Sequence, residues 1–160
     1  MLFRSDTGSG ALSNTFETGD ILDGRDGTDV LRVDLIETGT ISDTVNATAI
    51  SATTSSIEQV YLRQQSPQGD PAVNGSTIDA EKMADVEQWW SDNSRSGIQI
   101  EDIRSATEET TFGMRLTDPR VNFTNYFNAL FLEGDVDPGV SAFSFRIAET
   151  GNAAAEIANI

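Results

Sequence analysis

The chain has 160 residues, enough for one ordinary domain or for two small β units that share a core. Its 26 acidic and 10 basic residues give a formal net charge of −16, so the surface repels nucleic acid and anionic membranes. The absence of cysteine and histidine excludes disulfides, Cys/His zinc sites, thiol nucleophiles and Ser-His-Asp triads.

Two further features concern where the protein works. No apolar run approaches the ~20 residues needed to span a bilayer, so we expect neither membrane insertion nor a nucleic-acid partner. Residues 1–6 lack the apolar region of a signal peptide. An acidic, lysine-poor chain favours an extracellular setting. Such a setting requires an export signal outside this segment, or that the chain is part of a larger polypeptide or assembly.

The N-terminal part is predicted to move from a flexible lead-in to β structure. Residues 1–14 are rich in Gly, Ser and Asn and indicate the lead-in. Residues 15–18 are a short strand candidate. After an Asp/Gly-rich turn, residues 30–35 carry apolar side chains at every second position, which predicts a strand.

The Asp/Gly-rich turn offers the most specific chemistry in the chain. Glycines three residues apart let the backbone turn tightly and aim carbonyl oxygens inward, and aspartates place hard carboxylate oxygens beside them. This pattern predicts a calcium-binding turn whose candidate ligands are Asp20, Asp23, Gly24, Asp26, Gly27 and Asp29. The alternative is a solvated Asp/Gly turn without metal. The spacing does not fit an EF-hand, and the acidic pair Asp135 and Asp137 is interpreted as a Pro/Gly turn.

The middle of the chain admits two interpretations. Residues 38–56 favour β structure or loop, 56–62 predict a strand, 66–75 a loop rich in breakers and 98–103 another strand. Apolar residues within 77–90 have the spacing of a short amphipathic helix. However, residues 57–60 and 86–89 share an apolar-Glu-Gln-apolar pattern, and we interpret them as successive turns of a loose repeat.

The C-terminal part has a different pattern. Residues 111–116, 123–132 and 142–147 predict longer, aromatic strands joined by Pro-containing turns, which is typical of an antiparallel sheet in a sandwich. The alanine-rich tail at 152–160 is either a helix turn or a chain end. The predicted organisation is therefore a lead-in at 1–14, a calcium-binding repeat-like β region at 15–104 and an antiparallel β region at 105–160.

Residues 24–32 resemble the nonapeptide of RTX proteins, Gly-Gly-x-Gly-x-Asp-x-apolar-x. Gly24, Gly27, Asp29 and Leu31 match it, and Arg25 replaces the second glycine. The frame over 15–104 looks like the calcium-binding repeats of bacterial surface-layer proteins, large RTX adhesins and virion-associated proteins. The resemblance implies rungs of a parallel β-roll or β-helix with Ca²⁺ bound between them. It makes Asp29 the side-chain ligand, and this single nonapeptide would need Asp20 and Asp23, or a neighbouring chain, to complete the site.

The remaining candidates for chemistry have simpler explanations. The Trp89–Trp90 pair resembles a sugar-stacking platform, but we expect one ring in the core and the other over a groove. The acidic pairs Glu101/Asp102 and Glu108/Glu109 do not form catalytic dyads, because adjacent residues on a strand face opposite ways.

The sequence thus predicts an all-β protein without catalytic residues. We expect a non-enzymatic, calcium-stabilised structural or assembly module of an extracellular, cell-surface or virion structure. The alternative is an adhesin module that binds glycan or a host surface, and the third hypothesis is a polysaccharide-acting enzyme whose carboxylates meet on folding. Because a repeat rung cannot bury both faces alone, we expect self-association or a larger surface assembly.

Overall fold

The computed structural model describes residues 2–3, 5–6, 12–14, 16–36, 49–65, 74–104, 110–117, 121–127, 142–145 and 154–159. Its strands are β1 (Leu2–Phe3), β2 (Ser5–Asp6), β3 (Leu12–Ser13), β4 (Ile21–Asp23), β5 (Val30–Leu35), β6 (Thr53–Ser55), β7 (Gln59–Gln64), β8 (Asn74–Asp79), β9 (Gln88–Asp92), β10 (Gly97–Ile103), β11 (Thr111–Arg115), β12 (Phe123–Phe127), β13 (Ala142–Phe145) and β14 (Ala154–Asn159). Over these ranges the fold is all-β, and no helix long and apolar enough to cross a membrane occurs.

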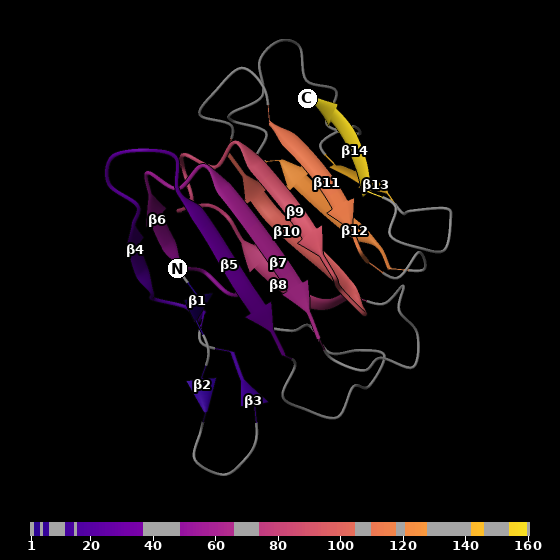
Figure 1. The fold of residues 1–160 in the computed structure, drawn as a ribbon, viewed down its shortest axis with the longest axis horizontal. Helices are drawn as coiled ribbons and strands as arrows, with labels where there is room; N and C mark the ends of the chain where they lie inside the picture. The colour runs from indigo at the N-terminus through magenta and orange to yellow at the C-terminus, as the bar shows by residue number, and fades with distance from the viewer. Residues whose placement is uncertain are drawn as a thin grey trace.

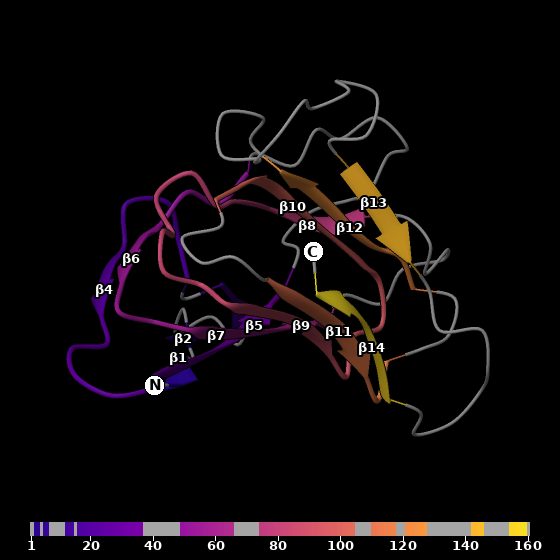
Figure 2. The same cartoon turned by 90° about the horizontal axis from the view of Figure 1, so that it is seen from above.

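Two larger sheets lie over one another and enclose the core (Figure 2). One has the strand order β1-β5-β7-β9-β11-β14 and the other β13-β12-β10-β8, while β2-β3 and β4-β6 form two-stranded sheets. From β7 to β12 the chain enters the two larger sheets alternately, and each strand lies beside the previous strand of the same sheet (Figure 1). Neighbouring strands from β5 to β11 and from β8 to β12 are consequently parallel.

The parallel register repeats from turn to turn. Asp34 of β5 contacts Arg63 of β7 across a sequence separation of 29 residues, and the same separation joins β7 to β9. Gln59 pairs with Gln88, and Val60 with Trp89. The apolar-Glu-Gln-apolar echo is therefore a structural repeat, which confirms its interpretation as successive turns.

The alternative helix over 77–90 does not form. The chain instead ends β8 at Asp79, turns and begins β9 at Gln88. Ala80, Met83 and Val86 are buried because the connection wraps around the core, and Met83 pairs with Thr54 of β6 in a parallel bridge. In this segment the buried connection has apolar residues at the same intervals as an amphipathic helix would, so the spacing alone could not distinguish the two.

Columns of apolar side chains fill the space between the sheets. Leu31, Val60, Trp89 and Phe112 succeed one another across β5, β7, β9 and β11, and each is at most 1% exposed. The facing sheet contributes buried side chains that include Ile78, Ile98, Ile100 and Phe123. Burying each such side chain contributes about 1.5–3 kcal/mol, so the inward columns are what hold successive turns in register.

The expected antiparallel β-sandwich at the C-terminal end is not seen in the described residues. β11 pairs in parallel with β9, and β12 pairs in parallel with β10. Within the described parts of the two larger sheets, antiparallel pairing occurs only where β14 and β13 lie on the outer sides of β11 and β12. The apolar alternation of 111–116 is equally compatible with both directions. Parallel pairing places Phe112 opposite Trp89, as the next member of the column of buried side chains.

Other expectations have mixed outcomes. The strand at 30–35 is confirmed, whereas residues 16–18 form a turn and the tail at 154–159 is a strand. Phe16 is fully buried, and the Glu17 N–H donates to Asp20, which favours the turn. The lead-in contains β1, β2 and β3. Of the expected loop at 66–75, residues 66–73 lie outside the described residues, and Asn74 and Gly75 already belong to β8. The strand end at 128–132 and the pairs Glu108/Glu109 and Asp135/Asp137 also lie outside the described residues.

Candidate functional site

The outer face of the sheet β5-β7-β9-β11 gathers polar and aromatic side chains from turns that are far apart in sequence. Leu31, Val33 and Leu35 point inward, so the residues between them point outward. In register, Arg32 lies opposite Tyr61, Tyr61 opposite Trp90, and Trp90 opposite Gly113. The four turns thus form one continuous outward row.

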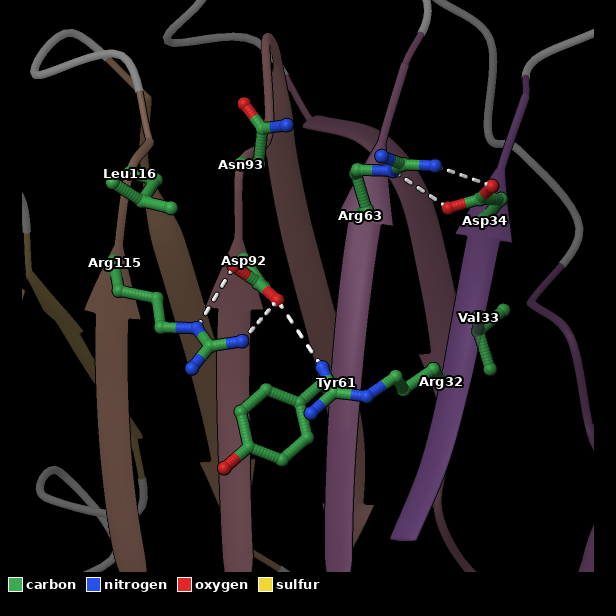
Figure 3. A pocket seen from close by; sticks show the side chains of 9 residues that line it. All are labelled: Arg32, Val33, Asp34, Tyr61, Arg63, Asp92, Asn93, Arg115 and Leu116. Carbon is green, nitrogen blue, oxygen red and sulfur yellow. Dashed lines mark hydrogen bonds and ion pairs between the residues drawn. The ribbon is translucent and has the colours of Figure 1, made fainter. Parts of the chain in front are cut away.

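The next outward row is charged and joins the turns in pairs. The Arg63 guanidinium donates two hydrogen bonds to Asp34, at 2.7 and 2.6 Å, and Arg115 donates two to Asp92, at 2.9 and 2.7 Å. Arg32 reaches the same Asp92 at 3.4 Å, as the dashed lines in Figure 3 show. Each carboxylate therefore uses both oxygens to tie strands together.

These contacts shift the titration of two arginines. The pKa of Arg63 is raised above its ordinary value, mainly by its hydrogen bonds to Asp34 and further by the charges of Asp34 and Asp92, while burial acts in the opposite direction. The pKa of Arg115 is raised in the same way by Asp92, with a smaller contribution from Tyr61. Both guanidinium groups are held in the charged form.

The aromatic part of this face lies flat against neighbouring turns. The rings of Tyr61 and Trp90 are stacked, with centroids 5.9 Å apart and planes inclined by 8°. The guanidinium carbons of Arg32 and Arg115 lie 4.3 and 4.8 Å from the Tyr61 centroid. A Cβ atom at Gly113 would come within 2.2 Å of the Trp90 ring, so only glycine leaves room for it.

The Trp89–Trp90 pair divides as expected in one respect. Trp89 is fully buried in the core, and Trp90 is partly exposed on the outer face. The indole N–H of Trp90 donates a hydrogen bond to Gln88 at 3.2 Å.

A pocket of about 330 Å³ opens on this face. We call it the outer-face pocket; it is lined by Arg32, Val33, Asp34, Tyr61, Arg63, Asp92, Asn93, Arg115 and Leu116 (Figure 3). Asn93 and Leu116 have φ values of 55° and 51°, a conformation that costs energy for residues other than glycine. Asn93 directly follows β9 and Leu116 directly follows β11. The Asn93 N–H donates a hydrogen bond to the carbonyl of Arg115.

Sequence reasoning missed this pocket. Its residues come from four segments of the chain, in or directly after β5, β7, β9 and β11, and no motif connects them. The available signal was the echo of residues 57–60 and 86–89. Extended by one position, it aligns Tyr61 with Trp90, and the same step of 29 residues back from Tyr61 reaches Arg32.

The predicted calcium ligands lie on β4 and in the loop between β4 and β5. Asp20 accepts a hydrogen bond from the Glu17 N–H at 2.9 Å, and Asp23 accepts from the Arg25 N–H at 3.0 Å and from the Ser55 hydroxyl at 3.3 Å. These are the roles of aspartates in a turn that needs no metal. Asp26 is exposed and Asp29 is half-buried.

The backbone of this loop is shaped by the next turn of the stack. A Cβ atom at Gly24 would lie 1.8 Å from the carbonyl oxygen of Ser56, so the glycine permits close approach of the two turns. Gly27 has a φ of 117°, and Arg25, at the position of the motif's second glycine, has a φ of 70°. The loop therefore keeps a glycine-like conformation where the RTX-like pattern has a glycine.

The carboxylates do not gather into a recognisable metal centre. No group of three or more Asp or Glu side chains that could hold an ion occurs in the part of the chain that the structure describes. The Asp29 backbone N–H instead donates to Glu58 of the next turn at 2.6 Å. The calcium site at Asp20, Asp23, Gly24, Asp26, Gly27 and Asp29 therefore stays a prediction, whose carboxylates have the hydrogen-bond partners given above.

The acidic pair Glu101 and Asp102 offers no dyad either. Glu101 accepts a hydrogen bond from Gln99, and Asp102 is exposed with a φ of 54°.

Comparison of the chain with protein-family models, with curated proteins and with solved structures finds no match.

Proposed function

We propose that this chain is a non-enzymatic structural module with a β-helix-like stack of turns, working in an extracellular, cell-surface or virion assembly. The observation that carries the proposal is the repeated parallel register, in which β5, β7 and β9 succeed one another at a constant separation. Such a stack extends by adding turns and supplies length and stiffness.

The outward contacts support a structural role. Asp34 with Arg63 and Asp92 with Arg115 connect neighbouring turns on the solvent side, while apolar columns connect the same turns inside. Ties on both faces of one sheet resist separation of the turns.

The same contacts argue against catalysis at this face. Both oxygens of Asp34 accept hydrogen bonds from Arg63, and both oxygens of Asp92 accept from Arg115. A carboxylate held in this way is poorly placed to exchange a proton with a substrate. The polysaccharide-acting enzyme is therefore the least supported of the three hypotheses.

Self-association is part of the proposal, and β4 is the surface on which to test it. This strand is the outermost strand of the sheet β4-β6, and its Ile21 side chain is 81% exposed. An open strand edge with an exposed apolar side chain is a site at which a second copy can add.

Light scattering over a range of protein concentrations tests the assembly role. We expect the mean mass to rise with concentration, and Ile21→Lys to reduce that rise. Thr28→Lys, at another exposed position nearby, is the control for the added charge and should associate like the parent chain. A monodisperse monomer at every concentration would count against the proposal.

The glycan-binding adhesin is the second candidate, and the outer face favours it specifically. Tyr61 and Trp90 present parallel rings beside the outer-face pocket, and arginine, aspartate and asparagine side chains surround them. Aromatic rings with polar neighbours are the usual components of a sugar site.

A further inference from the structure

The outer-face pocket reverses the electrostatic character of the molecule. The chain as a whole carries a formal charge of −16, yet the pocket lining contains three arginines and two aspartates. Three of the ten basic residues therefore line one pocket, and their contacts with Asp34 and Asp92 join residues that are 23 to 60 positions apart in sequence. A local positive charge inside a negative field selects small anions over polyanions, since the rest of the surface repels a long chain of charges.

The three arginines are not equivalent. Arg63 and Arg115 each commit two donors to a carboxylate at short distance. Among the described residues, Arg32 makes one ion pair, at 3.4 Å to Asp92, besides lying over the Tyr61 ring, and its side chain is 48% exposed. Because a guanidinium has five N–H donors, Arg32 retains donors for a further carboxylate, and a bidentate pair is its preferred geometry.

The residues around Arg32 offer further contacts, aromatic and polar, of the kind that a bound sugar makes. The Arg32 guanidinium and that of Arg115 cover the Tyr61 ring, and the parallel Trp90 ring lies next to them, so a group bound to Arg32 lies close to the aromatic surface of Trp90. Asn93 offers an amide donor and acceptor at the pocket, where Leu116 is 48% exposed. The left-handed backbone at both of these residues is the kind of strain that collects at binding sites.

We propose that the outer-face pocket binds a saccharide that carries a carboxylate, such as a uronic or sialic acid residue. Arg32 holds the carboxylate, Trp90 supports the sugar ring, Tyr61 positions the Arg32 guanidinium, and Asn93 binds a hydroxyl group. The inference rests on the glycan-binding candidate function and specifies its ligand. The pocket volume of about 330 Å³ lies at the small end of the range for ligand sites, which fits one short unit of a glycan.

Calorimetric titration of the full chain tests this assignment. The probes are digalacturonate and N-acetylneuraminate, with galactobiose as the neutral counterpart and sodium acetate as the plain carboxylate. We expect each acidic saccharide to bind at least about tenfold more tightly than galactobiose or acetate, the difference expected of one charge-assisted pair. Arg32→Met should remove that preference.

Arg25→Met is the matched control, because Arg25 is exposed on the loop before β5 and its removal changes the net charge equally. This variant should retain the preference for acidic sugars. Far-UV circular dichroism of both variants verifies the fold, and a Trp90→Ala variant should weaken binding of every saccharide without changing that of acetate.

The outcomes separate the inference from the candidate function. Equal binding of acidic and neutral saccharides that depends on Trp90 would overturn the inference and leave glycan binding intact. Equal binding of acetate and acidic saccharides would also overturn it, since the pocket would then be a simple anion site. Failure of all saccharides to bind would overturn both the inference and the glycan-binding candidate.

Discussion

Gly113 is a single residue on which the arrangement of the outer face depends. It is buried beneath the six-membered ring of Trp90, and it lies between Phe112 and Met114, whose side chains are buried in the core. Any side chain at this position would push the Trp90 ring away from the sheet and from Tyr61.

We predict that Gly113→Ala lowers the free energy of unfolding by about 1–3 kcal/mol, the usual cost of overpacking. Urea denaturation measures the change, and tryptophan fluorescence reports the displaced ring. In a Trp90→Ala background the same substitution should cost nothing, because alanine reduces the entropy of the unfolded chain relative to glycine. An equal cost in both backgrounds would show that Trp90 is not the obstacle.

Ser94 supports the corner between β9 and β10 through its buried hydroxyl. That hydroxyl accepts from the Gln64 backbone N–H at 3.1 Å and from the Ser91 hydroxyl at 3.0 Å, and it contacts the Leu62 carbonyl at 3.3 Å. The residue is 2% exposed, so water cannot replace these contacts.

Ser94→Ala is predicted to destabilise the fold by about 1–3 kcal/mol, because buried polar groups lose a partner. Ser55→Ala removes an exposed hydroxyl that donates to Asp23, and it should change stability by less than about 0.5 kcal/mol. Chemical denaturation of the two variants side by side gives the comparison. Similar small effects for both would mean that the corner does not depend on Ser94.

The arginine pKa shifts have a defined consequence for pH. Folding raises the pKa of Arg63 and Arg115, so their stabilisation is fully present below the unfolded-state pKa and is lost only as the pH rises through the folded-state value. Arginine titrates far above neutrality. From the arginine side, the two pairs therefore contribute no pH dependence under physiological conditions. Since Arg63 and Arg115 are 39% and 37% exposed, each pair contributes at most about 1 kcal/mol.

At the scale of the element, the loop from β4 to β5 separates two explanations of the same aspartates. The sequence and its RTX-like pattern predict calcium ligands, whereas the structure uses Asp20 and Asp23 as acceptors within the turn. The two explanations make different predictions in the presence of a chelator.

Asp23→Ala is predicted to lower the free energy of unfolding by about 0.5–1.5 kcal/mol, with calcium and with chelator alike, because it removes the acceptor of the Arg25 N–H and the Ser55 hydroxyl. Thermal melting followed by circular dichroism measures this. The exposed Glu87, outside the loop, provides the control substitution Glu87→Ala.

The calcium prediction is tested in the same melts. If calcium binds the native loop, excess calcium raises the melting temperature by mass action, and Asp29→Ala removes most of that response. Identical melting of the parent chain in excess calcium and in excess chelator would refute the calcium site. The turn-acceptor role of Asp23 would stand in that case.

At the scale of the whole molecule, the stack has two differently built sides. Its interior columns are apolar, and the outer face of β5-β7-β9-β11 is covered by paired charges and stacked rings.

We predict no hydrolysis of polysaccharides by the purified chain. The paired states of Asp34 and Asp92, and the absence of histidine and cysteine from the sequence, leave no evident acid–base pair. Reducing-sugar release from a panel of acidic and neutral polysaccharides is the measurement. Turnover that is abolished by Asp92→Asn or Asp34→Asn would contradict the prediction and favour the third hypothesis.

Much of the inward half of this fold was predictable from the residues alone. The alternation at 30–35 identified a strand with one buried face, and the echo between 57–60 and 86–89 identified neighbouring turns. Both signals arise because burial of apolar side chains repeats with the period of a strand and with the length of a turn. The absence of cysteine and histidine limited the available chemistry in the same direct way.

Only the tertiary structure decided the direction of the C-terminal strands and the composition of the outer face. Parallel and antiparallel pairing place the same alternating residues inward, so the pattern at 111–116 could not distinguish them. The parallel pairing of β11 with β9, which places Phe112 opposite Trp89, is visible only in the structure. Arg32, Tyr61 and Asp92 meet because two successive turns have the same length, a property of the whole connection and not of any motif within it. The outer-face pocket therefore had no local signature, although every residue in it was visible in the sequence.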